Sequence, residues 1–300
     1  MVSTASMVNA SALRRHVSAF LSSKAPRRAP LLNILKRVID QRFSAVLFGG
    51  TLRDMAVYGP ARDPRDVDIV VDGASIETLA TLFADVLVRK TRFGGLHLNS
   101  SGWMIDIWPL NQTWAVLERR AGEADFEALT RTTFLNVEAI AVELKMGRRK
   151  VYSSGFFEAV GNRVLDINLE ENPFPALASI RTLVTAAKFQ YSISKRLARY
   201  VVYHTNKTPL EQMVSIQLSH YGIARLNEDR INQWTDTLSD QLATGSSLRV
   251  PGLKPTQLTL WESAKDTTLR PKASIISRYR SEQNATPLLP QPSTATPCDI

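Results

Sequence analysis

Two carboxylates inside an apolar segment constrain this 300-residue chain more than any other feature of its sequence. Asp66 and Asp68 flank Val67 at the start of a run, residues 66–71, that is typical of a β-strand. Because side chains alternate across a strand, both carboxylates lie on one face and Val67 on the other. Two like charges on a buried sheet are unfavourable unless a cation neutralises them. The pair therefore predicts a site for a hard divalent cation, Mg²⁺ or alternatively Mn²⁺, together with bound phosphate.

A third carboxylate and a glycine turn extend this expected site. Asp106 stands alone among apolar residues, where a lone carboxylate has no local reason to lie. Three carboxylates on neighbouring strands can hold two metal ions, one activating a hydroxyl nucleophile and the other stabilising a triphosphate leaving group. Gly49 and Gly50 end an apolar run and let backbone amides approach phosphates closely, because neither carries a Cβ. Arg53, at the start of the next helix, adds a charged contact.

Each of these features also has a purely structural explanation. An isolated Asp-x-Asp commonly lies at a solvated turn or edge, and Gly-Gly after a strand is commonly only a turn. Asp106 could pair with Arg89 or Arg92 on a neighbouring strand. Their combination in this order is much more specific than any one of them.

The spacing of apolar residues predicts an α+β fold. Helices are expected at 31–41, 52–58 and 76–85, and strands at 44–48, 67–71, 86–88, 95–98 and 103–108. From about residue 176 the pattern turns helical and stays so to about 245. We expect four regions: a basic N-terminal arm (1–30), a small mixed-sheet head domain (31–150), a mostly helical neck and body domain (151–280) and a disordered tail (281–300).

Charge and composition bound the partners and the location. The net charge is +9, and seven Lys and Arg residues but no acid precede Asp40, which favours a polyanionic partner such as nucleic acid. We expect a cytoplasmic protein, with organellar targeting by the basic N-terminus as a minor alternative. The sequence contains no run of about 18 apolar residues, so no membrane span is predicted. The single cysteine, Cys298, excludes an intrachain disulfide and a cysteine-based zinc site.

Residues 49–59 (GGTLRDMAVYG), followed by Asp66 and Asp68, resemble the first motif of the polymerase-β-like nucleotidyltransferase superfamily. The likeness is greatest to the head domain of class II CCA-adding enzymes and bacterial poly(A) polymerases, in which GGxVRDxLLG precedes DxD. The resemblance implies a palm-like head and catalytic, metal-binding roles for Asp66, Asp68 and Asp106. It also implies contacts with the nucleotide for Gly49, Gly50, Thr51, Arg53 and Asp54.

Two later segments resemble the same family more weakly. Residues 131–140 (RTTFLNVEAI) are similar to its RRDFTINAL motif, which implies nucleotide contacts for Arg131 and Asn136. Residues 174–191 are similar to EDPLRILRALRFAARLGF, which implies a nucleotide contact for Arg181.

The last segment departs from the family where the base is selected. Phe174-Pro175 stands in place of the acidic pair, and Ala178 replaces the first arginine. In the family, that Asp and Arg read the base edges of CTP and ATP. We therefore do not expect ordered addition of C, C and A.

The expected activity is metal-dependent transfer of a nucleoside monophosphate from an NTP to an acceptor hydroxyl. An RNA 3′ end, tRNA in particular, is the favoured acceptor. A small molecule, a protein hydroxyl or a second nucleotide is the alternative, and a non-catalytic nucleotide- or RNA-binding relative is another. Lys188, Lys195 and Arg199 would share one face of a continuous helix, as an RNA surface or merely a solvated face. His97, His204 and His220 lack ligand spacing and are interpreted as structural or surface residues. The preferred NTP and the oligomeric state are left open.

Overall fold

A seven-stranded mixed sheet is the centre of the first half of the chain. The computed structural model describes residues 8–252, apart from 65, 92–93, 119–121 and 146. The strand order is β3-β4-β5-β2-β1-β6-β7, and β2–β5 is the one parallel pair of this sheet in the described residues. The strands are β1 (Ser44–Phe48), β2 (Asp66–Asp72), β3 (Leu87–Lys90), β4 (Leu96–Ser100), β5 (Trp103–Pro109), β6 (Ile140–Glu143) and β7 (Val151–Ser153).

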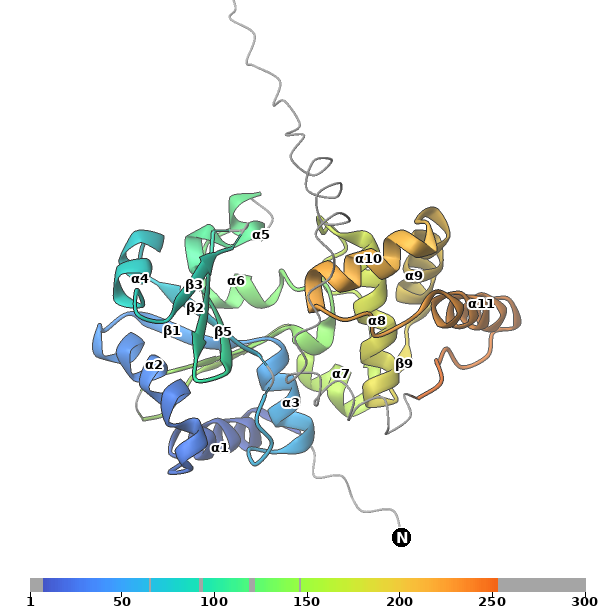
Figure 1. Cartoon of the computed structure of the whole chain (residues 1–300). Helices are drawn as coiled ribbons and strands as arrows, with labels where there is room; N and C mark the ends of the chain where they lie inside the picture. The colour runs from blue at the N-terminus through green and yellow to red at the C-terminus, as the bar shows by residue number, and fades with distance from the viewer. Residues whose placement is uncertain (1–7, 65, 92–93, 119–121, 146, 253–300) are drawn as a thin grey trace, which may run out of the picture.

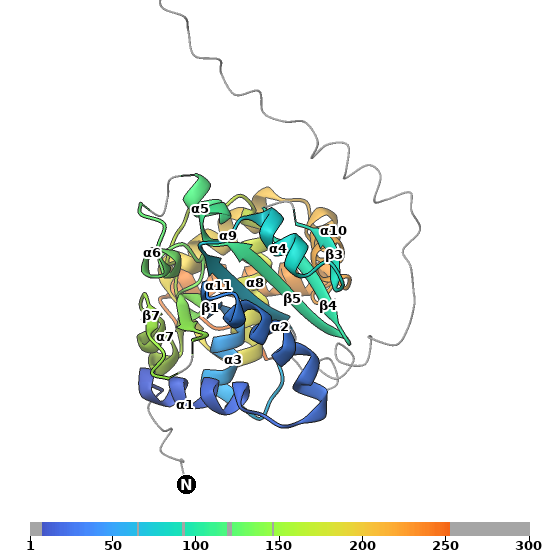
Figure 2. The same cartoon turned by 90° about the vertical axis from the view of Figure 1, so that its left-hand side faces the viewer.

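Helices cover one face of this sheet. In Figures 1 and 2, α1 (Ala10–Leu21), α2 (Ala29–Asp40) and α4 (Ile76–Leu82) lie on the side of the sheet turned away from the later helices. Val67, Ile69 and Ile105 point into this layer and are fully buried in the main core. Full burial of one such side chain contributes roughly 1.5–3 kcal/mol. The opposite face of β2 is left for the carboxylates.

The N-terminal segment differs from the expected arm. Residues 10–21 form α1, whose Leu13, Val17 and Phe20 are fully buried in the core of the head. The spacing of four and three residues places these side chains on one face of the helix, and that face packs toward the sheet and α3 (Gly50–Tyr58). The division into domains stays a prediction, but this helix packs with the head.

The second part of the chain is helical, as expected. Leu183, Leu197 and Trp234 belong to a separate core that α8, α9 and α11 share. Figure 1 shows these helices on the side of the head opposite α2. The helices are α7 (Phe156–Asn162), α8 (Pro175–Phe189), α9 (Lys195–Lys207), α10 (Leu210–Tyr221) and α11 (Glu228–Thr244), and a two-stranded sheet joins β8 (Val164–Leu165) to β9 (Ser192–Ile193). Short elements complete the head: η1 (Pro26–Arg28) lies between α1 and α2, and the connection from β5 to β6 contains η2 (Leu110–Gln112), α5 (Trp114–Leu117), α6 (Phe126–Thr130) and η3 (Asn136–Glu138).

The expectation of one continuous helix through Lys188, Lys195 and Arg199 is wrong. Gln190 ends α8 with a left-handed backbone (φ +55°), and Ser194 caps the start of a new helix, α9. Lys188 instead donates to the Asp54 carboxylate at 2.8 Å. Only Lys195 and Arg199 remain together, one turn apart on α9 and both exposed.

Within the described residues, no helix is both long and apolar enough to cross a membrane. The expected disordered tail, residues 281–300, lies outside the described part of the chain.

Candidate active site

The strand register brings the three predicted carboxylates to one face of the sheet. In the parallel pair β2–β5, Asp68 is the partner of Asp106, and Asp66 is the partner of Met104. Neighbouring partners in a sheet point to the same face, so Asp66, Asp68 and Asp106 share the face that the main core leaves uncovered. The sequence predicted a common face only for Asp66 and Asp68. The pairing of β2 with β5 adds Asp106.

Asp68 is the most perturbed of the three. Burial, followed by the charges of Asp106 and Asp66, raises its pKa from 3.8 to about 7, although Arg181 opposes this shift. Within the described residues, no hydrogen bond or salt bridge holds the Asp68 carboxylate. Asp68 is therefore a buried carboxylate beside two further acids, opposed at longer range by Arg181.

His97 belongs to this face, which the sequence interpretation missed. The ring Nδ1 of His97 lies 2.6 Å from Asp106 Oδ1, and the two residues are register partners in the antiparallel pair β4–β5. Asp106 is thus held by His97 rather than by Arg89, which is exposed on β3. Arg92, the other proposed partner, lies outside the described residues. The signal was present in the hairpin turn at 99–102, because a turn fixes which residues of its strands face each other.

The Gly49-Gly50 turn lies directly beside the carboxylates. Gly49 adopts a positive φ of +66°, which favours glycine, and its N–H donates to Ile140 O at 3.0 Å. A Cβ at Gly49 would lie only 4.0 Å from Asp68 Oδ2. The Thr51 hydroxyl donates to Asp66 O at 2.8 Å and ties the start of α3 to the start of β2. The turn and the two aspartates are therefore one rigid unit.

Arg53 is the centre of an ion network. Its Nη1 lies 2.9 Å from Glu138 Oε1, its Nη2 lies 2.9 Å from Asp54 Oδ1, and its guanidinium stacks over the Phe189 ring at 4.9 Å. Although burial opposes the shift, Arg53 and Lys188 hold the pKa of Asp54 below its ordinary value.

Glu138 joins this network to the helical part of the chain. Arg181 Nη2 on α8 lies 2.7 Å from Glu138 Oε2, so Glu138 bridges Arg181 and Arg53. Burial would raise the pKa of Glu138, but the charges of Arg181 and Arg53 outweigh it and lower the pKa. Glu138 was not among the predicted site residues. Its side chain is nearly buried at 13% exposure, whereas that of Arg181 is 48% exposed and faces the cluster.

Arg131 and Asn136 are placed differently. Arg131 is exposed at the end of α6. The Asn136 amide donates to Val164 O at 3.1 Å, and its oxygen accepts from Asp166 N at 3.0 Å. Asn136 thereby ties η3 to β8, and nucleotide contacts by either residue stay a prediction.

The donor chemistry of the carboxylate cluster fits a hard divalent cation. Asp66, Asp68 and Asp106 offer only oxygen ligands, and the raised pKa of Asp68 reflects charge that a cation would neutralise. In the described part of the chain, no group of three or more His, Cys, Asp or Glu side chains is arranged to hold a metal ion as it stands.

Comparison with solved structures identifies the fold. A CCA-adding enzyme in complex with CTP is 16% identical and aligns with a TM-score of 0.52 over 78% of this chain and 57% of that one. The Bacillus stearothermophilus CCA-adding enzyme in complex with CTP is 18% identical, with a TM-score of 0.50 over 78% of this chain and 56% of that one. A tRNA nucleotidyltransferase complexed with a primer tRNA and an ATP analog is 17% identical, with a TM-score of 0.50 over 69% of this chain and 61% of that one.

The chain spans less than two thirds of the length of each of these proteins. No family model matches the sequence, and no curated protein matches it. These alignments show that the chain has the fold of the CCA-adding enzyme and tRNA nucleotidyltransferase structures.

Proposed function

We propose that this protein is a metal-dependent nucleotidyltransferase, which transfers a nucleoside monophosphate from an NTP to an acceptor hydroxyl and releases pyrophosphate. One observation carries the proposal: Asp68 and Asp106 are register partners on one face of the sheet, and a Cβ at Gly49 would lie 4.0 Å from Asp68 Oδ2. Carboxylates for a cation and a close-approach turn for phosphates are thus adjacent. Fold alone would not support this conclusion, because one fold serves many functions.

Asp66, Asp68 and Asp106 would hold the divalent cation, Mg²⁺ or Mn²⁺. When bound, such a cation neutralises triphosphate charge and lowers the pKa of the attacking hydroxyl. The absence of a Cβ at Gly49 and Gly50 lets the triphosphate approach the backbone at the start of α3.

The ion network supplies positive charge beside the carboxylates. Its three cations, Arg53, Arg181 and Lys188, exceed its two anions, Asp54 and Glu138, by one charge. Arg181 is the half-exposed member, and Glu138 holds it in place at 2.7 Å. We assign Arg181 as the phosphate-contacting arginine and Arg53 as the residue that positions Glu138, because Arg53 is only 12% exposed.

An RNA 3′ end, such as that of a tRNA, is the proposed acceptor. The net charge of +9 and the tRNA-bound neighbour of the same fold support it. Ordered C, C, A addition is not proposed. Ala178 is buried at 6% exposure and has no polar side-chain atom. Phe174, the N-cap residue of α8, has none either. Neither side chain can therefore form a hydrogen bond with a base edge.

The test incubates the pure protein with each labelled NTP, Mg²⁺ and total RNA, and follows the label. Asp68→Asn should abolish the transfer, whereas Asp72→Asn, an exposed aspartate at the other end of β2, should leave it unchanged. Circular dichroism checks that both variants fold. Near-parental transfer by Asp68→Asn would show that the carboxylate cluster is not the catalytic site.

If the label appears on a small molecule or a protein and the RNA stays unlabelled, the proposed nucleotidyl transfer holds but the acceptor is not RNA. No labelled product with any NTP would favour a nucleotide-binding relative without activity.

A further inference from the structure

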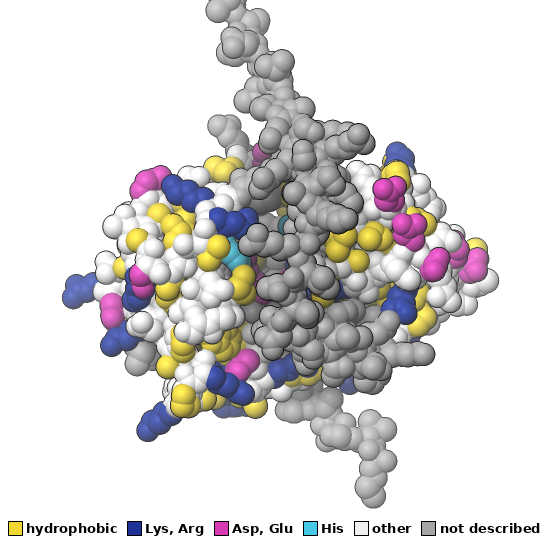
Figure 3. Space-filling model, viewed as in Figure 1, with side chains coloured by type: hydrophobic (Ala, Val, Ile, Leu, Met, Phe, Trp, Pro, Cys, Tyr) yellow, Lys and Arg dark blue, Asp and Glu magenta, His cyan; other side chains and the backbone are white. Residues whose placement is uncertain are grey.

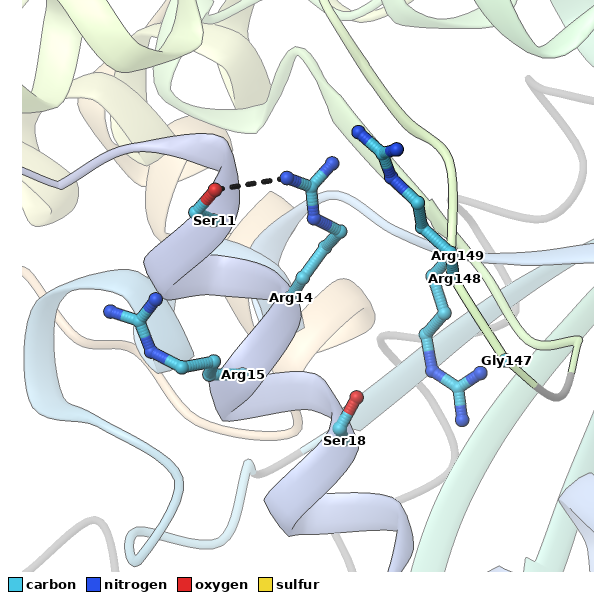
Figure 4. Close-up of a pocket in the computed structure, with 7 residues that line it drawn as sticks. All are labelled: Ser11, Arg14, Arg15, Ser18, Gly147, Arg148 and Arg149. Atoms are coloured by element: carbon cyan, nitrogen blue, oxygen red, sulfur yellow. Dashed lines mark hydrogen bonds between the residues drawn. The ribbon is translucent and has the colours of Figure 1, made fainter.

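A second basic site lies far from the carboxylates, between α1 and the turn that joins β6 to β7. It is a pocket of about 430 Å³. Its polar lining comes from two segments far apart in sequence and comprises Ser11, Arg14, Arg15, Ser18, Arg148 and Arg149. Figure 4 shows Arg14 and Arg149 directed toward the same end of the gap, with Arg148 directed toward Ser18 at the other end.

The four arginines of this pocket lack acidic partners. Within the described residues, none of them forms a salt bridge with Asp, Glu or a chain terminus, and no acid lines the pocket. Arg14 donates to the Ser11 hydroxyl at 2.9 Å, and this neutral partner does not offset the charge of the guanidinium. The pocket therefore carries four positive charges that the protein leaves uncompensated.

Arg149 is the clearest sign that the pocket is built for an anion. It is only 8% exposed, and its Nε is buried without a hydrogen-bond partner, while Nη1 donates to Lys145 O. Burial lowers the pKa of Arg149, and no acid nearby offsets this effect. Burial of a charged donor atom without a hydrogen-bond partner is unfavourable. A bound anion would remove that cost.

The pocket is at the opposite end of the sheet from the carboxylates. Gly49 N donates to Ile140 O at the carboxylate end of β6, whereas Leu144 N donates to Ala45 O at the other end, and the arginine turn follows. Four residues of strand separate the two ends by about 13 Å. A nucleotide held by Asp68 is thus a different ligand from the occupant of this pocket.

We propose that this pocket, which we call the four-arginine pocket, binds a ligand bearing two or more phosphate groups. Arginine is suited to this task, because its planar fork of donors matches phosphate oxygens. A single phosphate carries about two negative charges. Arg14, Arg148 and Arg149 lie at the gap, whereas Arg15 is directed to the other side of α1 (Figure 4), and three arginines at the gap match a chain of phosphates better than one phosphate. The backbone of an RNA and a free polyphosphate share this chemistry. In contrast, α11 presents four exposed acids, on the right of Figure 3.

The test removes two surface arginines of the pocket and keeps the fold. Arg14→Ala/Arg148→Ala is compared with Lys24→Ala/Lys36→Ala, which removes the same charge from exposed positions outside the pocket. Binding of a labelled single-stranded RNA and of pyrophosphate is measured in EDTA between 50 and 200 mM salt. EDTA keeps divalent cations, and with them metal-dependent binding at the carboxylates, out of the measurement.

The arginine variant should bind at least one of the two ligands fivefold or more weakly than the lysine control. If RNA is the ligand, the slope of log affinity against log salt should also fall by roughly 1–1.5, because each phosphate contact in single-stranded nucleic acid contributes about 0.7. Loss of RNA binding alone identifies backbone phosphates, and loss of pyrophosphate binding alone identifies a free polyphosphate. Equal binding of both ligands by the two variants would overturn the proposal. The result is independent of nucleotidyl transfer, since neither ligand is a substrate in EDTA.

Discussion

Replacement of Asp68 by asparagine should stabilise the metal-free protein above neutral pH. Burial and the neighbouring charges of Asp106 and Asp66 raise the pKa of Asp68 from 3.8 to about 7. Between these values the folded state holds a proton that the unfolded state has released, so stability falls as pH rises. A shift of about 3 units corresponds to at most ~4 kcal/mol, since one unit equals 1.36 kcal/mol. Asparagine carries no charge, and its variant escapes this loss.

The assay is thermal unfolding in EDTA at pH 5 and pH 8. For a chain of this size, 1 kcal/mol shifts Tm by roughly 2–4 °C, so Asp68→Asn should melt up to ~10 °C above the parent at pH 8. At pH 5 the difference should be less than half as large, because stability has then fallen only over the interval from pH 3.8 to pH 5. Mg²⁺ at pH 8 should raise the Tm of the parent and not that of the variant, because the cation binds the charged cluster. Asp72→Asn is the control. A variant no more stable than the parent at pH 8 would refute the argument.

Three other changes test separate parts of the structure. Phe20→Ala should destabilise the protein by about 3–5 kcal/mol in urea unfolding, because Phe20 is fully buried; an effect under 1 kcal/mol would mean that α1 is not part of the core. Glu138→Gln should cost about 1–3 kcal/mol and raise the KM for NTP more than it lowers kcat, because Arg53 and Arg181 lose their shared partner; unchanged KM and stability would contradict this. Sequencing of the products formed on a trimmed tRNA should show no ordered C, C, A, because Phe174 offers no polar side-chain atom; ordered addition would mean that other residues read the base.

Local sequence was sufficient to predict the elements around the carboxylates. β1 and the strand of Asp66 and Asp68 were expected within a residue of their observed limits, because apolar alternation and a Gly-Gly stop act over a few residues. The expected helix at 76–85 ends earlier, at Leu82, since Phe83 leaves the helical conformation. Element boundaries depend on packing that a short window does not contain.

The partners of site residues could not be predicted in the same way. The bridge from Glu138 to Arg53 joins residues 85 positions apart, and the contact of Lys188 with Asp54 joins residues 134 apart. The first pair depends on how α3 packs against η3 within the head, and the second on how α8 meets the head. No local period encodes either arrangement. The contact of His97 with Asp106 could have been predicted, because the hairpin turn sets the register of their two strands.

Because β2 and β5 pair in parallel within the seven-stranded sheet, insertions and deletions affect the site differently in the loops and in the strands. The loops between β2 and β5, outside α4, β3 and β4, can change in length without moving Asp106 relative to Asp68, provided that β5 re-enters the sheet in the same register. One residue added or lost within β5 before Asp106 would turn that carboxylate into the buried layer and bring Ile105 or Ile107 onto the polar face. Natural length variants should therefore cluster in the β2–β5 connection and spare the strands themselves.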